Sequence, residues 1–164
     1  MLRGIIMGVA GCGKSSVGAE MAERLSARYF DGDDLHPPEN IEKMSAGHPL
    51  DDADRAPWLS LVGAALSAAE SPILVGCSAL KRKYRDIIRD AAGGPVVFVH
   101  LAGAREVIEA RMSQREGHFM PVSLLDSQFA ALEDLQPDET GVVIDIDQPF
   151  DAVVEEATEK VKNT

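Results

Sequence analysis

The feature of this sequence that most constrains its fold is the run Gly8–Ser15, GVAGCGKS, which matches the pattern G-x-x-x-x-G-K-[ST]. The preceding run, Leu2–Met7, is short, apolar and bounded by glycine, which predicts a buried β-strand. After the pattern, Val17, Met21 and Leu25 recur every four residues and predict one apolar face of a helix. The strand, glycine-rich turn and helix together predict a loop that binds phosphate groups. The alternative is a glycine-rich strand-to-helix turn without a ligand.

Each kind of residue in this loop suits one part of a nucleotide. Glycines let backbone N–H groups approach a phosphate chain closely, and the helix N-terminus adds partial positive charge. Lys14 is placed to reach the β- and γ-phosphates, and the Ser15 hydroxyl is placed to bind Mg²⁺. We therefore predict ATP and Mg²⁺ as ligands, with nucleotide-binding residues Gly8, Gly11, Cys12, Gly13, Lys14, Ser15 and Ser16.

Strands and helices alternate along the rest of the chain. Apolar runs predict further strands at residues 28–30, 72–77, 96–101 and 142–146. Helices are predicted at residues 14–27, 39–46, 104–114, 123–133 and 150–161, with two more starting at Pro57 and Lys81 and with Ser123 as a candidate N-cap. Because β-α-β crossovers are right-handed, this alternation predicts an α/β fold: a five-stranded parallel sheet with helices on both faces. We find no internal repeat or linker, so residues 1–164 are expected to form a single domain.

The charge balance limits the partners of the chain. Sixteen basic and 27 acidic residues give a formal net charge of −11, which argues against nucleic acid or an anionic membrane as a partner. No stretch approaches the roughly 20 apolar residues of a membrane span, and the start lacks the long apolar region of a signal peptide. We therefore expect a cytoplasmic protein in which Cys12 and Cys77 are reduced thiols.

An acidic run, Asp31-Gly32-Asp33-Asp34, follows the predicted second strand. In open α/β sheets the carboxyl ends of the strands form the edge where ligands bind. If the strand continues through this run, Asp31 and Asp33 point to the same side. One carboxylate can then hold Mg²⁺ or its water, while the other accepts a proton from an attacking hydroxyl. The alternative is a solvated acidic turn.

Basic side chains also follow the predicted strand ends or open the next helices. Phosphoryl transfer requires cations near the γ-phosphate, and these often come from a mobile segment, for which Arg115–His118 is suited. Other basic residues in such places are Arg55, Lys81, Arg82, Arg85 and Arg111, whereas Lys83 and Arg89 are expected on an exposed helix face.

Histidine and tryptophan residues divide into two groups. His36 and His118 lie in polar loops beside the inferred site and are candidate ligand contacts. His48 and His100 are expected to be structural, and Trp58 is expected in the core or in a pocket wall. No His/Cys cluster has zinc spacing, so Mg²⁺ is the one metal that the sequence indicates.

Several stretches of the chain occur together in a characteristic order: Met7–Ser15, Phe30–Pro37, Asn40, Lys43-Met44, Gly47, Pro49-Leu50, Asp54-Arg55, Pro57–Leu59, Cys77–Lys81, Tyr84–Asp86, Arg111, Arg115, His118–Met120 and Ser127–Phe129. This set, spread from about Ile5 to Glu139, resembles gluconokinase of the small P-loop type. The resemblance implies a P-loop kinase fold related to shikimate and nucleoside monophosphate kinases, with a small mobile lid at about residues 111–122. It also implies a homodimer that transfers the γ-phosphate of ATP to the 6-hydroxyl of D-gluconate.

The resemblance implies a role for each matching position. Lys14, Asp33 and Arg115 are expected to be catalytic, with Asp33 as base or hydroxyl-positioning group, and Asp31 to lie on the Mg²⁺ side. Arg111 is expected beside the adenine. The residues expected to bind gluconate are Asp33, His36, Arg55, Ser78, Lys81, Arg85 and His118.

Two departures and two alternatives accompany the resemblance. Cys12 replaces the usual serine of the loop, where only the backbone is needed, and His100 replaces a more usual tyrosine. The alternative functions are a kinase for another small hydroxy acid, such as shikimate, and a P-loop nucleotide sensor without catalytic activity.

Overall fold

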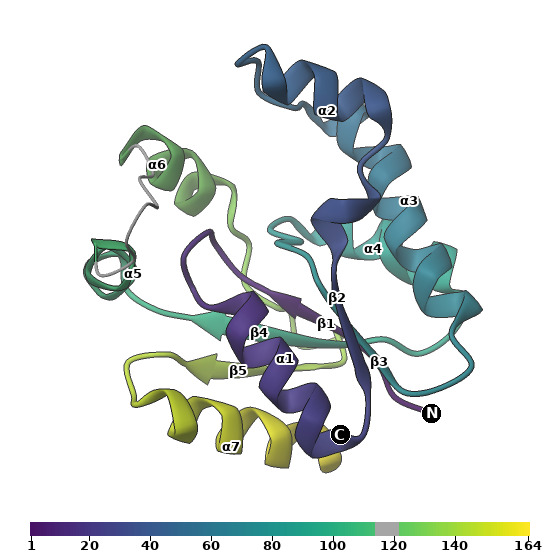
Figure 1. Ribbon diagram of the computed structural model, residues 1–164, viewed down its shortest axis with the longest axis vertical. Helices are drawn as coiled ribbons and strands as arrows, with labels where there is room; N and C mark the ends of the chain where they lie inside the picture. The colour runs from purple at the N-terminus through teal and green to yellow at the C-terminus, as the bar shows by residue number, and fades with distance from the viewer. Residues whose placement is uncertain (114–121) are drawn as a thin grey trace.

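A parallel sheet in the strand order β2-β3-β1-β4-β5 organises the molecule (Figure 1). The computed structural model describes residues 1–113 and 122–164. The strands are β1 (Arg3–Met7), β2 (Arg28–Asp31), β3 (Ile73–Gly76), β4 (Val97–Ala102) and β5 (Gly141–Asp145), and all neighbouring pairs are parallel. The predicted α/β fold with a five-stranded parallel sheet is confirmed. The carboxyl ends of β1, β2 and β3 therefore meet at one edge.

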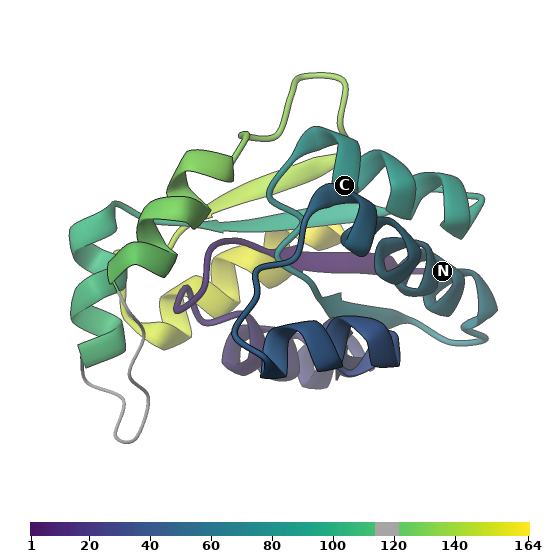
Figure 2. The same ribbon diagram turned by 90° about the horizontal axis from the view of Figure 1, so that it is seen from above.

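Helices cover both faces of the sheet (Figures 1 and 2). Helices α1 (Lys14–Leu25) and α7 (Phe150–Lys162) pack on one face, and α3 (Asp52–Ala68) and α4 (Arg82–Ala92) pack on the other. Successive side chains of a strand point to opposite faces of the sheet. Ile6 therefore packs in the hydrophobic core on the side of α1 and α7, and Ile5 and Met7 pack in the core on the side of α3 and α4. The remaining helices are α2 (Pro38–Ser45), α5 (Arg105–Ser113), α6 (Val122–Ala131) and the 3₁₀ helix Gly32–Leu35.

Two predicted helix starts are wrong. Helix α3 begins at Asp52 rather than at Pro57, because Asp51 accepts from the Asp54 N–H while the Asp54 side chain accepts from the Asp51 N–H. This reciprocal cap satisfies two backbone donors before the proline is reached, so Pro57 lies inside the helix. Helix α6 begins at Val122, so Ser123 is not its N-cap.

The two cysteines are buried and free, as expected for reduced thiols. Within residues 1–113 and 122–164, no helix combines the length and the apolar character that crossing a membrane requires.

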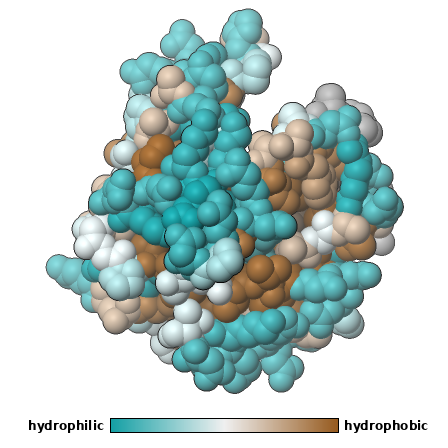
Figure 3. Space-filling view, turned by 180° about the vertical axis from the view of Figure 1, so that it is seen from behind, coloured by the Kyte–Doolittle hydropathy of each residue, from teal (hydrophilic) through white to brown (hydrophobic). Residues whose placement is uncertain are grey.

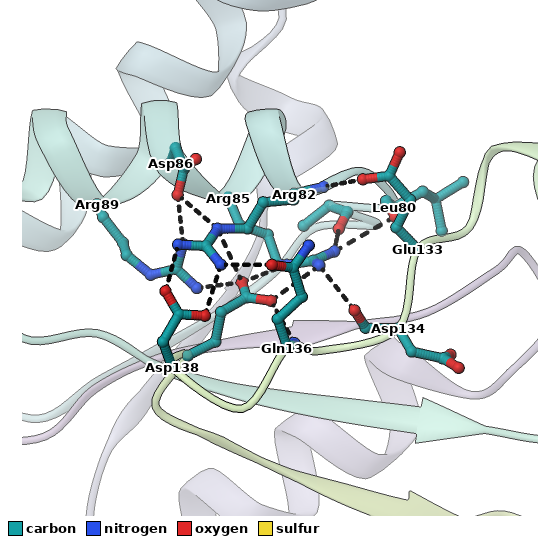
Figure 4. A network of polar contacts seen from close by, with 11 residues as sticks. Leu80, Arg82, Arg85, Asp86, Arg89, Glu133, Asp134, Gln136 and Asp138 are labelled. Carbon is teal, nitrogen blue, oxygen red and sulfur yellow. Dashed lines mark hydrogen bonds and ion pairs between the residues drawn. The ribbon is translucent and has the colours of Figure 1, made fainter.

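A buried arginine joins α4 to the segment that follows α6 (Figure 4). The side chains of Arg85 and Glu139 are both 0% exposed, and their atoms meet at 2.7 Å (Nε–Oε1) and 3.0 Å (Nη2–Oε2). Arg85 also donates to the carbonyls of Ala79, Leu80 and Asp134, at 2.9, 3.3 and 3.3 Å. All donor groups of this guanidinium are therefore used inside the protein.

Exposed ion pairs surround this buried one. Arg82 forms a two-pronged pair with Asp138 at 2.8 and 3.1 Å, and its backbone N–H donates to Glu133 at 2.8 Å. Arg89 pairs with Asp86 and with Glu139. The sequence predicted Arg89 as a cation on an exposed helix face. In the structure it is instead part of this network.

The buried pair makes stability depend on pH. Burial alone raises the pKa of Glu139, but hydrogen bonds from Arg85, the Gln136 N–H and Arg89 lower it to about 2. A glutamate in an unfolded chain has a pKa of about 4.3. The stabilisation is therefore fully present above about pH 4.3 and is lost as the pH falls toward about 2.

We expect Glu139→Gln to lower the free energy of unfolding by about 3–5 kcal/mol at pH 7, because it leaves the buried Arg85 charge without an anion. Urea denaturation followed by circular dichroism measures this loss, and the gap to the wild type should narrow as the pH falls from about 4.3 to 2. Asp138→Asn, which removes an exposed partner of Arg82, is the matched control and should cost much less. Equal losses for the two variants would contradict the assignment.

Candidate active site

A cavity of about 590 Å³ lies at the carboxyl edge of the sheet. Its walls come from the phosphate loop and the start of α1, from the ends of β2 and β3, and from α5, α6 and α7; they include Ala10, Gly11, Cys12, Gly13, Lys14, Ser15, Ser16, Asp31, Asp33, Ser78, Arg111 and Gln128. Figure 3 shows the notch between the lobe formed by α2 and the start of α3 and the lobe formed by α5 and α6. The structure thus brings together most of the residues predicted to bind the nucleotide.

The phosphate loop presents free backbone donors to this cavity. Gly11 and Gly13 have φ angles of 83° and 97°, values that favour glycine. Gly13 is the N-cap of α1 and provides no side-chain cap, so the first N–H groups of the helix remain available to an anion. The Cys12 side chain is buried and burial raises the pKa of its thiol, so only the backbone of Cys12 serves the site.

Lys14 is folded back onto its own loop. Its Nζ donates to the carbonyls of Gly8 and Val9 at 3.1 and 3.3 Å. These are neutral acceptors, and a cation binds a phosphate group more strongly than a neutral carbonyl. Lys14 therefore rests beside the place where a phosphate chain would bind.

The acidic run does not continue the strand, contrary to the sequence-based interpretation. β2 ends at Asp31, whose Oδ1 accepts from the Asp33 N–H at 2.9 Å and so starts the 3₁₀ helix Gly32–Leu35. The Trp58 indole donates to the Gly32 carbonyl at 2.8 Å and holds this turn in place, and Trp58 is a buried core residue, one of the two places expected for it. Asp31 and Asp33 both line the cavity even so.

The environment of Asp33 favours its neutral form. Partial burial and the nearby charge of Asp31 raise its pKa, while His36 and Lys14 oppose the shift. The carboxylate is 74% exposed, so water weakens these effects. Asp33 therefore has a slightly raised basicity, which suits a proton acceptor.

His36 lies beside Asp33 in a rigid stack. Its ring stacks on Trp58 with centroids 4.1 Å apart, and its Nε2 lies 3.9 Å from Asp33 Oδ1. Burial lowers the pKa of His36, so the ring is neutral at pH 7. The Asn40 amide donates to the Asp54 carbonyl and also faces His36 Nδ1 at 3.2 Å, which makes Nδ1 the acceptor and leaves the proton on Nε2, facing Asp33.

Two of the predicted acceptor-binding cations gather around Tyr84. The Arg55 guanidinium and the Lys81 ammonium lie 5.7 and 5.5 Å from the centre of its ring. Asp52 Oδ1 accepts a hydrogen bond from the Tyr84 hydroxyl and lies 3.5 Å from Lys81 Nζ. Asp52 Oδ2 pairs with Lys83. Arg55 lies three residues before Trp58 on α3, and Trp58 stacks on His36, so the cluster lies on the side of the 3₁₀ helix Gly32–Leu35. Arg55, Lys81 and Tyr84 do not themselves line the cavity.

The remaining predicted site residues fall in three places. Arg85 is buried in the network behind α4, so it is not available to a substrate carboxylate, and the sequence-based expectation for it is wrong. Arg111 donates to the carbonyls of Ile146 and Gln148 beside the apolar cavity wall. Arg115, His118 and most of the predicted lid lie outside the described residues.

Sequence reasoning gave no role to three residues near the site: Asp52, Tyr84 and Gln128. Tyr84 is buried, and its hydroxyl joins the cation cluster. The capping pattern before Pro57 could have drawn attention to Asp52. The contact of Gln128 with the loop has no local signal in the sequence.

The residues present fit a magnesium ion. Asp31 and Ser15 line the same cavity and offer oxygen atoms. Among the described residues no group of three or more acidic, histidine or cysteine side chains forms a metal cage. This arrangement suits Mg²⁺, which takes one or two protein oxygens and completes its shell with water and phosphate oxygens.

A phosphate loop at the carboxyl edge of a 2-3-1-4-5 parallel sheet, with carboxylates and cations facing it, defines a P-loop phosphotransferase for small molecules. The family model of shikimate kinase matches residues 10–136. The thermoresistant and thermosensitive gluconokinases of Escherichia coli K12 are 46% and 49% identical to this chain; both alignments cover 96% of it, and 92% and 86% of the respective relatives.

A solved structure agrees with these relatives. The crystal structure of a gluconokinase from Sinorhizobium meliloti 1021 superposes with a TM-score of 0.91 at 47% identity, covering 99% of this chain and 92% of the other. The chain belongs to the gluconokinase family of P-loop kinases.

We expect Lys14→Ala to lower the rate of ADP formation by at least about 10²-fold, because it removes a preorganised donor to the transferred phosphoryl group. A coupled spectrophotometric assay measures the rate. The thermal unfolding midpoint should hardly change, since within the described part of the chain Lys14 donates its hydrogen bonds to carbonyls of its own loop. Lys162→Ala, at an exposed position near the end of α7, is the control. A Lys14→Ala variant with near-normal turnover would remove the loop lysine from the reaction.

Proposed function

We propose that this protein transfers the γ-phosphoryl group of ATP to the 6-hydroxyl of D-gluconate, giving 6-phospho-D-gluconate and ADP. The observation that carries the proposal is one cavity whose walls include both the phosphate loop and Asp33. Membership of the gluconokinase family supports the choice of acceptor.

The chain's own residues divide the reaction between them. Loop N–H groups and Lys14 hold the phosphate chain, and Arg111 with Ile146, Phe150 and Val153 forms the wall for the base. The acceptor oxygen forms a bond to the γ-phosphorus while the bond from that phosphorus to the β,γ-bridging oxygen breaks. Asp33 accepts the proton that the hydroxyl releases. Ser15 and Asp31 would hold Mg²⁺, which would supply neutralisation of the phosphate charge.

Recognition of gluconate depends on local cations. Its carboxylate is an anion, and the protein carries a net charge of −11, so the overall field does not attract it. Arg55 and Lys81 are the cations of the cluster around Tyr84, and the planar guanidinium of Arg55 can hold a carboxylate with two parallel hydrogen bonds. Ser78 lines the cavity and provides a further polar contact.

The two alternative functions have weaker support. The shikimate kinase model covers residues 10–136, whereas the gluconokinase relatives align over 96% of the chain. A sensor without catalysis does not require a carboxylate of raised basicity beside the phosphate loop.

Several finer expectations stay predictions, some from the composition of the chain and some from the family resemblance. These are the homodimer, the cytoplasmic location, a single domain of residues 1–164, and a lid at about residues 111–122 that brings Arg115 and His118 to the substrates.

We expect Asp33→Asn to lower kcat by roughly 10²–10⁴-fold with little change in ATP affinity, because proton acceptance matters only in the transition state. In the wild type, kcat should fall as the pH drops through the pKa of Asp33, which lies above the usual aspartate value, and this fall should be absent in the variant. Steady-state kinetics across pH and nucleotide titrations measure both effects.

Asp34→Asn is the matched control, since this exposed carboxylate follows directly on the same 3₁₀ helix. If Asp33→Asn instead loses ATP affinity while kcat survives, Asp33 is a metal-side carboxylate and the assigned roles of Asp31 and Asp33 are reversed.

We expect gluconate to exceed sorbitol in kcat/KM by at least ~30-fold, because a neutral acceptor leaves a cation of the site unpaired at a cost of about 2–5 kcal/mol. Arg55→Ala should narrow this ratio by losing gluconate activity while changing sorbitol activity little. Steady-state kinetics with each acceptor in a separate assay measure the two kcat/KM values. Arg28→Ala, at the opposite end of β2, is the control. Comparable efficiencies in the wild type would indicate a general polyol kinase.

A further inference from the structure

Gln128, on α6, contacts the phosphate loop directly. Its Oε1 accepts a hydrogen bond of 2.6 Å from the backbone N–H of Ala10, 118 residues away in the sequence. Because a backbone N–H can only donate, the amide atom that faces it must be the oxygen, and this fixes the orientation of the whole planar group. Gln128 also lines the 590 Å³ cavity.

This contact holds one end of the peptide group between Val9 and Ala10. In a trans peptide the carbonyl oxygen and the amide hydrogen point in opposite directions. The Val9 carbonyl accepts from Lys14 Nζ at 3.3 Å, while the N–H of the same peptide donates to Gln128. Lys14 and Gln128 therefore hold this peptide from opposite sides. When Lys14 moves to a phosphate chain, Gln128 still fixes the loop at this point.

The nitrogen end of the Gln128 amide is available to a ligand. It carries two N–H donors, and no partner for it occurs within residues 1–113 and 122–164. In a phosphate loop the helix N-terminus faces the α- and β-phosphates, and the lysine marks the β,γ end. The Val9–Ala10 peptide is where Lys14 rests, so Gln128 lies at the γ-phosphate end of the loop.

We propose that Gln128 is a catalytic residue whose Oε1 stays on the Ala10 N–H while its Nε2 donates to an oxygen of the transferred γ-phosphoryl group. This inference rests on the proposed function. No covalent bond to Gln128 forms or breaks. The acceptor oxygen forms a bond to the γ-phosphorus, the bond between the γ-phosphorus and the ADP oxygen breaks, and the proton of the hydroxyl goes to Asp33. A neutral donor suits this position, because Asp31 and Asp33 line the same cavity and would pair with an added cation.

The test is Gln128→Glu, which keeps the chain length and an oxygen for Ala10 but replaces the donor with an anionic acceptor. We expect kcat to fall by about 10²–10³-fold in the coupled assay, the usual effect of removing one preorganised donor. Calorimetry on the full chain should show that affinity for the β,γ-imido analogue of ATP falls at least about tenfold, while affinity for ADP changes less than about twofold. ADP lacks the γ-phosphoryl group, so its binding should not depend on this donor.

Two further variants separate catalysis from support of the loop. Gln128→Met keeps the length and removes both donor and acceptor; it should also lose kcat. Ser127→Ala, at the neighbouring exposed position, removes a hydroxyl that donates to the Leu124 carbonyl and should change nothing. Equal losses of ADP and ATP-analogue affinity in the two Gln128 variants, or normal kcat in Gln128→Met, would overturn the proposal.

The outcome stays separate from that of the proposed function. If the wild type formed no 6-phosphogluconate, the acceptor assignment would be wrong, but the comparison of ADP with the ATP analogue would still report on the contact of Gln128 with the nucleotide.

Discussion

The buried pair between Arg85 and Glu139 is the interaction on which the geometry of the site depends. Arg85 reaches the carbonyls of Ala79 and Leu80, directly after β3, and that of Asp134, directly after α6. The Glu133 N–H also donates to the Leu80 carbonyl at 2.7 Å. The end of α6 is therefore fixed to the end of β3 by polar contacts, and α6 carries Gln128 to the phosphate loop.

This pair shows why a buried charge can be retained in a core. Replacing a buried ion pair with apolar residues is often neutral or stabilising. Here, however, the guanidinium also donates to three backbone carbonyls, and an apolar replacement would take this donor away from those of Ala79 and Asp134. The hydrogen bonds from Arg85 to these carbonyls offset the free-energy cost of burying its charge. They also allow the backbone at the edge of the site to be irregular.

The sequence predicted the sheet and the phosphate loop because their signals are local. Apolar runs between glycines located the strands to within one or two residues, and the loop pattern located the nucleotide site. The predicted start of α3 was wrong because it relied on the preference of proline for the first position of a helix. The reciprocal cap between Asp51 and Asp54 starts the helix earlier, at Asp52. Asp33 lies on a 3₁₀ turn rather than on a strand for a similar reason, since the Asp31 side chain accepts its N–H.

The wrong expectation for Arg85 shows a different limit of prediction from sequence. A basic residue at the start of a helix after a strand end was expected to meet substrate; for Lys81 this stays a prediction, and for Arg85 it is wrong. The sequence gives the charge of Arg85 but not its burial, which depends on Glu139, 54 residues away. The contact between Gln128 and Ala10 spans 118 residues and has no local pattern at all.

The cations of the site rest on internal oxygens that resemble the expected ligands. Lys14 lies on two loop carbonyls, and Lys81 lies 3.5 Å from the Asp52 carboxylate. The carbonyls are neutral, so exchanging them for a phosphate turns ordinary hydrogen bonds into charge-assisted ones, and binding gains energy without first exposing a bare cation. Asp52 carries a full charge, and its partners Lys83 and Tyr84 hold it in place, so a carboxylate bound as proposed would share Lys81 with it rather than displace it. The two lysines would therefore act differently: Lys14 would exchange its contacts for a phosphate group, and Lys81 would add a contact to those it already has.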